Sequence, residues 1–531
     1  MSELHLYLNA LIEATFKACQ SWLISDDDGG LRLVDPVDQK TVIAHYGDSH
    51  LAAALIILGK SRGDEAIVEQ GLQLVRTVLR DWNVAEGLAD FHHDFNNFAL
   101  CLVVEQLGSE VSDIVPEIKR VVLRTSDSKH DTVNWLPMRA YVNFCRHEWT
   151  GDRQFAVAGR RALEKVRRAT NADGGIEDRL PRGLSYNLQY NVASLAALVA
   201  LSRRWPGWEP VQDNSLDFLL SKVLPDGDIN YMGRGANQLF AWGPWLYILA
   251  SSRQLDAAKV AVQFLSSRYI RSIEKRNLML NEFNGQDKSF WWDYHYCSVY
   301  HAHFLLWSVL AAQCSEEHLF ADSTVKDMPA SLGKSSQTAT GLEIVGDEAG
   351  GAALFAGRTA YLAEAGPSIC ALWLPVDRVL FKGGLGPWKG DFGNKYSFAD
   401  TVFQNHFGLL SQSTNATRAN LRIIGKIFPN RVIGRNAVIK PVFSQVRIER
   451  GANSIQIVFE TDGHTGFFNA PLFEDEANNI IIEFFVDGNP LRAQNTGRSR
   501  NQYGWISVWR SQLANGKRWE ARIKTQTELT E

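Results

Sequence analysis

Six strongly apolar helical stretches recur along residues 1–314, and each opens with a cluster of polar and aromatic side chains. The stretches begin near His45, Phe91, Asn134, Ser185, Gly233 and Asn281. Their starts lie roughly 40 to 60 residues apart, a spacing that indicates a repeat architecture. Because a helix that is apolar all round must be enclosed by other structure, we expect these six helices to form the inside of a helical domain.

A more polar helix alternates with each apolar one. The polar-faced segments are 5–24, 64–82, 113–125, 155–169, 210–222 and 254–270, and the apolar ones are 45–59, 91–104, 133–149, 184–203, 232–251 and 289–313. Asp-Gly and Asn-Gly turns, such as those at 173–175, 226–228 and 284–286, supply the sharp reversals between them. Six helices of each kind predict a closed ring of helical hairpins, an α/α toroid with an inner and an outer layer.

The composition changes after the sixth pair. Residues 315–340 are polar, contain Pro and Gly, and have no sustained period, which is typical of a linker. From 341 to 531 the chain consists of short alternating or β-branched runs separated by Gly, Asn and Asp, a pattern that predicts an antiparallel β-sandwich. The predicted fold class is therefore α+β multidomain: an α/α toroid at 1–314, a linker at 315–340 and an antiparallel β-sandwich at 341–531.

Composition narrows the class of partner. A formal net charge of -4 gives no electrostatic reason to expect a nucleic acid or an anionic membrane. The 16 Trp, 14 Tyr and 27 Phe suit the flat faces of sugars, although most of them must be core residues. The six Cys are scattered, so we expect reduced thiols and no disulfide framework. The N-terminus has no signal peptide and no membrane span, which favours the cytoplasm, or a secreted or periplasmic site if the chain has been shortened there.

The polar clusters identify a candidate cleft. In a ring of hairpins the inner helices converge, so the side chains at their N-terminal ends line one mouth, where unpaired N–H groups favour an anionic ligand. The expected catalytic residues are Tyr190, Tyr186, His93, Asn97 and Arg234. The expected substrate-binding residues are His45, His92, Asn96, Asn134, Gln189, Gln238, Trp291 and His295, with Trp388 and His406 from a Gly-rich β-domain loop that overhangs the cleft.

Spacing supports the first of these sets. His93 and Asn97 are four residues apart and share a helix face, as do Tyr186 with Tyr190 and Arg234 with Gln238. One such pair is usually a cap or a satisfied buried group. Six polar clusters in register are harder to explain structurally, because each buried polar group without a partner costs free energy.

The toroid, the β domain and three local motifs together resemble the polysaccharide lyases of the chondroitin/hyaluronate, heparinase and alginate lyase type. The motifs are HHDFNN (92–97), GLSYNLQYN (183–191) and YMGRGANQ (231–238). The resemblance implies that an Asn and an Arg neutralise a uronate carboxylate while a His or Tyr transfers protons in a β-elimination. Asn97 and Arg234 are the residue types that stabilise the developing enolate. His93 suits a base near neutrality, and Tyr190 or Tyr186 suits the acid to the leaving oxygen.

Two other functions remain open at this stage. A glycoside hydrolase on the same toroid would use a pair of carboxylates, for which Asp48, Asp94, Asp178 and Asp293 are available. A non-enzymatic carbohydrate-binding protein would need no proton-transfer groups. The histidines lack the spacing of a zinc motif, so we expect no cofactor, and a divalent metal has no clear motif behind it. The expected partner is an acidic poly- or oligosaccharide; the sequence does not determine the oligomeric state.

Overall fold

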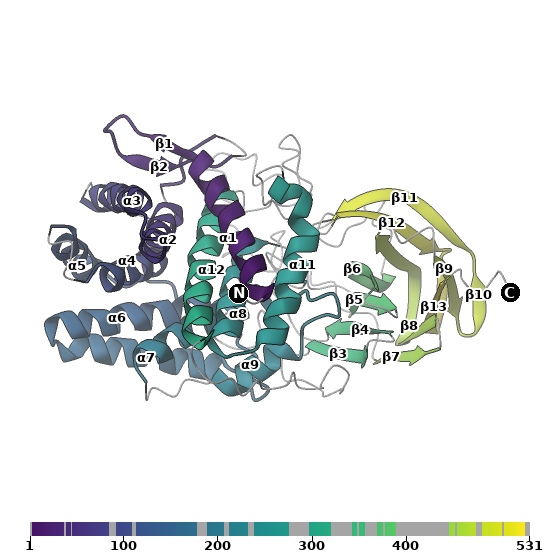
Figure 1. The fold of residues 1–531 in the computed structure, drawn as a ribbon. Helices are drawn as coiled ribbons and strands as arrows, with labels where there is room; N and C mark the ends of the chain where they lie inside the picture. Colours follow the sequence, from purple (N-terminus) through teal and green to yellow (C-terminus); the bar gives the residue numbers. More distant parts are fainter. Residues whose placement is uncertain are drawn as a thin grey trace, which may run out of the picture.

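A computed structural model of the chain has a helical N-terminal part and a β-rich C-terminal part (Figure 1). The structure describes residues 3–36, 39–43, 45–83, 92–108, 113–177, 188–206, 212–231, 238–274, 297–319, 342–347, 350–355, 369–374, 378–388, 445–451, 454–473, 480–501 and 504–525.

Six helices form the inner layer of the helical part. They are α2 (Gly47–Arg62), α4 (His93–Leu107), α6 (Leu136–Thr150), α8 (Leu188–Arg204), α10 (Trp242–Ser251) and α12 (Cys297–Leu319). Each of these helices contacts the next in this order, and α12 returns to contact α2. The inner layer is therefore a closed ring, and the predicted α/α toroid is confirmed.

The outer layer consists of the more polar helices. They are α1 (Glu3–Ser21), α3 (Glu65–Asn83), α5 (Ile114–Arg124), α7 (Arg153–Ala169), α9 (Gln212–Leu220) and α11 (Leu255–Glu274). Each of the other outer helices packs on the inner helix that precedes it: α3 on α2, α5 on α4, α7 on α6, α9 on α8 and α11 on α10. The N-terminal helix α1 packs on both α11 and α12, so the two ends of the helical segment meet and complete the outer layer.

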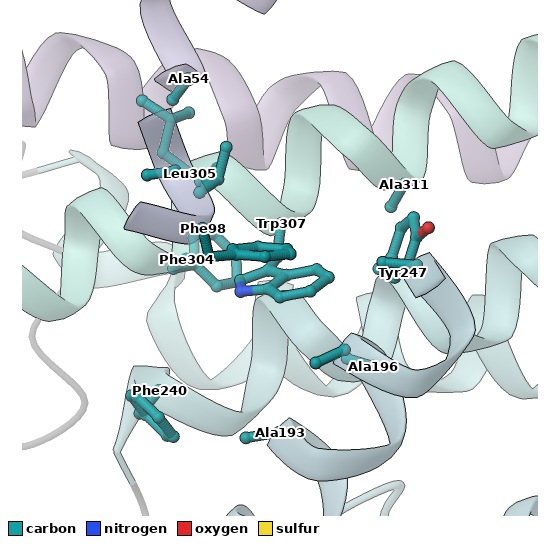
Figure 2. Packing of buried hydrophobic residues seen from close by; sticks show 14 of the residues in the cluster. Ala54, Phe98, Ala193, Ala196, Phe240, Tyr247, Phe304, Leu305, Trp307 and Ala311 are labelled. Carbon is teal, nitrogen blue, oxygen red and sulfur yellow. The ribbon is translucent and has the colours of Figure 1, made fainter. Parts of the chain in front are cut away.

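Aromatic side chains fill the centre of the ring (Figure 2). Trp307 of α12 is fully buried, and its ring stacks on Phe98 of α4 with 5.5 Å between centroids. Tyr247 of α10 packs against the same indole at 5.1 Å. Such aromatic pairs stabilise a core by about 0.5–1.5 kcal/mol beyond the burial of their area. Because the centre is packed, a ligand site belongs at an end of the ring.

The predicted helix over 5–24 ends earlier than expected, because α1 stops at Ser21. The next residues form β1 (Leu23–Ser25), which pairs antiparallel with β2 (Leu31–Leu33). The hairpin is held from outside: the Arg32 guanidinium donates to both carboxylate oxygens of Asp81 on α3 at 2.7 Å. This tertiary ion pair outweighs the local helical pattern.

The C-terminal part consists of antiparallel strands. They are β3 (Leu342–Asp347), β4 (Gly350–Phe355), β5 (Ile369–Leu374), β6 (Arg378–Trp388), β7 (Gln445–Arg450), β8 (Ser454–Phe473), β9 (Ile480–Val486), β10 (Asn489–Leu491), β11 (Ala493–Asn501), β12 (Gly504–Ser511) and β13 (Ala514–Thr525). Their hydrogen-bonded order is β10-β9-β13-β8-β6-β5-β4-β3, and β6 joins the far end of β8.

The two halves of this path stack on each other as the predicted sandwich. Leu372 and Leu374 of β5 share a buried apolar cluster with Ile455 and Phe459 of β8. Successive side chains of a strand point to opposite faces. Accordingly Trp373, between the two leucines, belongs to the buried cluster of the toroid instead. The layer β3–β6 thus lies between the helices and the remaining strands (Figure 1). The helix α12 continues past residue 314, and positions 320–340 of the predicted linker lie outside the described residues.

Candidate active site

Side chains at the starts of the inner helices meet at one end of the ring. The Tyr46 ring, just before α2, lies 5.3 Å from the His92 ring, just before α4. His92 in turn lies 6.5 Å from Trp135 of the 3-10 turn η2 (Val133–Trp135), which leads into α6. Tyr190 in the first turn of α8 lies 6.1 Å from Phe240 of the 3-10 turn η3 (Leu239–Ala241), ahead of α10. The starts of α2, α4 and α6 therefore come together, as do those of α8 and α10.

His303 of α12 connects these two groups. Its imidazole stacks on Phe240 with 4.3 Å between centroids, and its centroid lies 5.8 Å from that of Tyr46. Its Nδ1 lies 3.1 Å from Nδ1 of His50 on α2. The resulting group, which we call the mouth cluster, comprises His45, Tyr46, His50, His92, Phe95, Trp135, Tyr190, Phe240 and His303.

Three imidazoles of the mouth cluster, those of His45, His50 and His303, are held in their neutral form. Burial lowers the pKa of His45 to about 2, and the neighbouring His92, 4.0 Å away between ring centroids, adds to the effect. Burial likewise lowers the pKa of His50 to about 3 and depresses the pKa of His303. A neutral imidazole carries a lone pair, so these side chains are able to accept a hydrogen bond at neutral pH, but a pKa this low makes them weak bases unless a ligand raises it.

Four amide side chains begin neighbouring inner helices and are buried: Asn97 of α4, Asn134 of η2, Gln189 of α8 and Gln238 ahead of η3. Among the described residues, no partner bonds to the Oδ1 atoms of Asn97 and Asn134, to either polar atom of Gln189, or to Oε1 of Gln238. Leaving a buried polar atom unbonded costs about 1–3 kcal/mol. These four residues, which we call the mouth amides, therefore destabilise the empty protein and have hydrogen bonds to offer a ligand.

Asn96 differs from the mouth amides because both of its polar groups are engaged. Its Oδ1 accepts from the Ser49 hydroxyl at 2.7 Å, and its Nδ2 donates to the His92 carbonyl at 3.1 Å. The side chain therefore ties α2 to α4.

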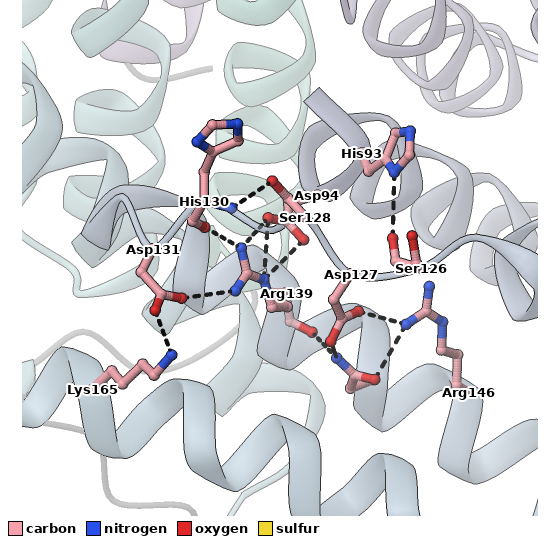
Figure 3. Close-up of polar contacts among 11 residues, drawn as sticks. His93, Asp94, Ser126, Asp127, Ser128, His130, Asp131, Arg139, Arg146 and Lys165 are labelled. Carbon is pink, nitrogen blue, oxygen red and sulfur yellow. Dashed lines mark hydrogen bonds and ion pairs between the residues drawn. The ribbon is translucent and has the colours of Figure 1, made fainter. Parts of the chain in front are cut away.

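His93 lies apart from the mouth cluster. Its Nδ1 is 3.3 Å from the Ser126 carbonyl oxygen, and its ring centroid lies 4.7 Å from that of Trp82 on α3 (Figure 3). The contacts of His93 are thus with an outer helix and the segment before α6, and none of the described contacts joins it to Tyr190.

Two of the described carboxylates at this end of the ring, those of Asp94 and Asp48, lie beside guanidinium groups. Asp94 is buried, and its Oδ2 accepts from Nη2 of Arg139 at 2.9 Å (Figure 3). Burial raises the pKa of Asp94, with Arg139 opposing the shift. Asp48 accepts from the Leu33 backbone N–H at 2.9 Å, and its Oδ2 lies 3.6 Å from Nη1 of Arg32. The other acids considered for a hydrolase, Asp178 and Asp293, lie outside the described residues.

Several predicted site residues also lie outside the part of the chain that the structure describes: Tyr186, Arg234, Trp291, His295 and His406. Trp388 is described only as the last residue of β6. Conversely, the sequence-based set omits Tyr46 and Phe240, whose rings join the inner helices at the mouth. Their signal in the sequence is an aromatic residue immediately beside a polar cluster, as in HYGDSH and NQLFAW.

Within the described ranges, no three His, Cys, Asp or Glu side chains gather in a way that would hold a metal ion. No helix in those ranges combines the length and the apolarity needed to cross a bilayer.

The sequence matches no protein-family model and no curated protein. Solved structures similar to this chain include a heparan sulfate lyase from Pedobacter heparinus, with 10% identity, a TM-score of 0.46, and coverage of 99% of this chain and 83% of that one. A polysaccharide lyase has 8% identity and a TM-score of 0.41, covering 60% of this chain and 99% of the other. An unsaturated glucuronyl hydrolase from Streptococcus agalactiae has 10% identity and a TM-score of 0.41, covering 58% and 91%.

Proposed function

We propose that the protein is a polysaccharide lyase that cleaves a uronic-acid-containing poly- or oligosaccharide by β-elimination. The observation behind the proposal is the pairing of two sets of side chains at one end of the ring. Each of the four buried mouth amides has an oxygen without a partner among the described residues, and Gln189 also has an unbonded Nε2 donor; the mouth cluster beside them supplies neutral imidazoles and phenols. Amide donors and proton-transfer groups are what an elimination next to a carboxylate requires.

The reaction divides naturally among these groups. Removal of the C5 proton places negative charge on the uronate carboxylate. The proposed donors that stabilise this charge are the Nδ2 group of Asn97 and the unbonded Nε2 group of Gln189, with Arg234 as the expected cation. The electrons then form the C4–C5 double bond while the C4–O bond breaks, and an acid protonates the departing oxygen. Tyr190 or Tyr186 is the proposed phenol for one or both proton transfers.

We assign the imidazole contribution to the pair His45 and His92 in place of His93. The pair lies in the mouth cluster, where the His92 ring contacts both His45 and Tyr46. Binding of an anionic sugar next to His45 would stabilise its protonated form and so raise its basicity. His93 has its contacts on the outer side of α4.

The state of the carboxylates favours elimination over hydrolysis. An inverting hydrolase requires one free acid and one free base about 6.5–9.5 Å apart. Asp48 and Asp94 are instead engaged with Arg32 and Arg139. Among the described residues, both acids considered for a hydrolase thus lie beside guanidinium groups, while the mouth offers amides, imidazoles and phenols.

The decisive experiment is incubation of the full chain with a panel of uronate polymers and their oligosaccharides. We expect absorbance to grow near the ultraviolet edge, because β-elimination conjugates the new double bond with the carboxylate. New reducing ends without that absorbance would replace the proposal with a glycoside hydrolase. Saturable binding with neither product would indicate a carbohydrate-binding protein.

A further inference from the structure

A lysine of the β layer reaches into the toroid and is buried there. Lys382 of β6 is only 5% exposed, and its Nζ donates to Oδ2 of Asp228 at 2.5 Å and lies 2.9 Å from Oδ2 of Asp226. Its Nζ also lies 4.9 Å from the ring centroid of Phe264 on α11. Asp226 and Asp228 belong to the Asp-Gly-Asp turn between α9 and α10, where Gly227 has a φ of 89°.

The same turn leads by hydrogen bonds to the mouth of the ring. Oδ1 of Asp228 accepts from the Asn230 backbone N–H at 2.7 Å. Nδ2 of Asn230, which is fully buried, then donates to the backbone carbonyl of Gln238 at 3.0 Å. Gln238 is one of the mouth amides, and its Oε1 has no partner among the described residues. Three consecutive polar contacts thus run from the layer β3–β6 to the backbone of Gln238, a residue of the candidate site.

We propose that Lys382 is a positioning residue, through which the β layer fixes the location of Gln238 at the mouth of the toroid. The inference rests on the proposed function only in taking Gln238 as a substrate-binding residue. In this role the layer β3–β6 contributes to the site without any strand residue contacting the substrate.

Because the charges of Lys382 and Asp228 are buried, the position of the turn depends strongly on the ion pair. Asp228 is 1% exposed, so its carboxylate has lost its hydration and depends on Lys382 and the Asn230 N–H for compensation. A buried ion pair tolerates few geometries, because its attraction must offset the desolvation of both partners. When the lysine is removed, the turn must move to rehydrate Asp228, and Asn230 moves with it.

The test compares Lys382→Met with Lys382→Arg in the full chain. The first readout is hydrogen exchange at the backbone amides of Asp228 and Asn230, both of which donate to carboxylates of the turn. We expect Lys382→Met to speed exchange there by at least roughly tenfold through local opening. The second readout is turnover of the uronate substrate, where we expect KM to rise by roughly 10–100-fold and kcat to change less. Lys382→Arg retains the cation, so both effects should be smaller.

Arg204→Met is the matched control. Nε of Arg204, at the C-terminal end of α8, lies 3.1 Å from Oε1 of Glu105, so this variant also breaks an ion pair but at the other end of the ring. It should lower the unfolding temperature without changing exchange at Asp228 or Asn230, or KM. If Lys382→Met does not fold, Asp226→Asn removes one carboxylate of the same turn and should shift both readouts in the same direction by less.

Unchanged exchange at Asp228 and Asn230 in a folded Lys382→Met protein would overturn the coupling. Faster exchange with wild-type KM and kcat would show that the turn moves without consequence for the site, which overturns the positioning role. A wild-type chain that acts on no uronate would remove the proposed function instead, while the exchange data would still decide whether Lys382 holds the turn.

Discussion

Tyr190 stands in the first turn of α8, half-buried against Phe240 in the mouth cluster. If Tyr190 transfers a proton, Tyr190→Phe should reduce kcat by roughly 10²–10⁴-fold, because that is the usual contribution of a general acid or base. Substrate binding should survive, since the ring remains. The measurement is kcat and KM from the ultraviolet absorbance of the unsaturated product.

Tyr141→Phe is the control for that variant. The Tyr141 hydroxyl, from the second turn of α6, donates to Oε1 of Glu105 near the C-terminal end of α4 at 2.6 Å. Its loss should lower stability by about 1–3 kcal/mol and leave turnover unchanged. Wild-type kcat in Tyr190→Phe would remove this phenol from the mechanism, and Tyr186 would become the residue to test.

Gln189 allows a second prediction at the level of single residues. It is fully buried, and neither of its polar atoms has a partner among the described residues. Replacing it with the similarly shaped Met removes the cost of the unbonded amide, so Gln189→Met should gain stability by about 1–3 kcal/mol. The same change should raise KM, because a hydrogen bond to the sugar is lost. A gain in stability with unchanged KM would make Gln189 a core residue only.

Sequence patterns predict which residues stand at the starts of the inner helices, but not the directions in which their side chains point. The mouth amides and Tyr190 are predicted from polar clusters at helix starts, and the structure places them there. The four-residue spacing of His93 and Asn97 predicts a shared face but not whether that face turns inward, which depends on how α4 packs. The pairing of Asp94 with Arg139 joins different helices, and no local pattern indicates it.

At the scale of elements, the alternation of apolar and polar-faced helices was sufficient to predict the toroid, because burial of a helix follows directly from its composition. The β1–β2 hairpin was not predicted. Its stability comes from the contact of Arg32 with Asp81 on α3, and a long-range ion pair leaves no trace in hydrophobic periodicity.

Asp48 of α2, which accepts from the Leu33 N–H of this hairpin, should make the stability of the protein depend on pH. Burial raises the pKa of Asp48 from 3.8 to about 6, against the opposing effects of the Leu33 N–H and Arg32. The folded protein therefore binds this proton more tightly than the unfolded chain does. The resulting stability is fully present below about pH 4 and is lost as the pH rises through about 6.

Asp48→Asn imitates the protonated side chain at every pH. Above pH 6 the variant should be more stable than the wild type by about 3 kcal/mol, the value of a shift of this size. The difference should shrink towards zero as the pH falls to about 4. Thermal or urea unfolding of both proteins across this range measures it. A wild type that gains stability over the variant as the pH rises would show that the ion pair with Arg32 dominates.

At the scale of the whole molecule, the β layer shares a core with the toroid. Leu342, Ile344, Ala353, Ala371 and Trp373 all belong to the buried apolar cluster of the helices. Alternation along strands predicts a sandwich, but it does not reveal that the outer face of one sheet is covered by a second domain. That arrangement depends on shape complementarity between segments distant in sequence.

Two neighbouring residues of β5 separate the two cores. Trp373 faces the toroid and Leu372 faces the other sheet, and both are fully buried. Trp373→Ala should destabilise the protein by about 3–5 kcal/mol and Leu372→Ala by about 2–5 kcal/mol, because each leaves a cavity. The two substitutions should loosen different parts of the molecule. Hydrogen exchange should accelerate in the toroid helices α9 to α11 for Trp373→Ala but stay within the strands for Leu372→Ala. Toroid exchange that is unaffected by Trp373→Ala would mean that the toroid and the strands open independently of each other.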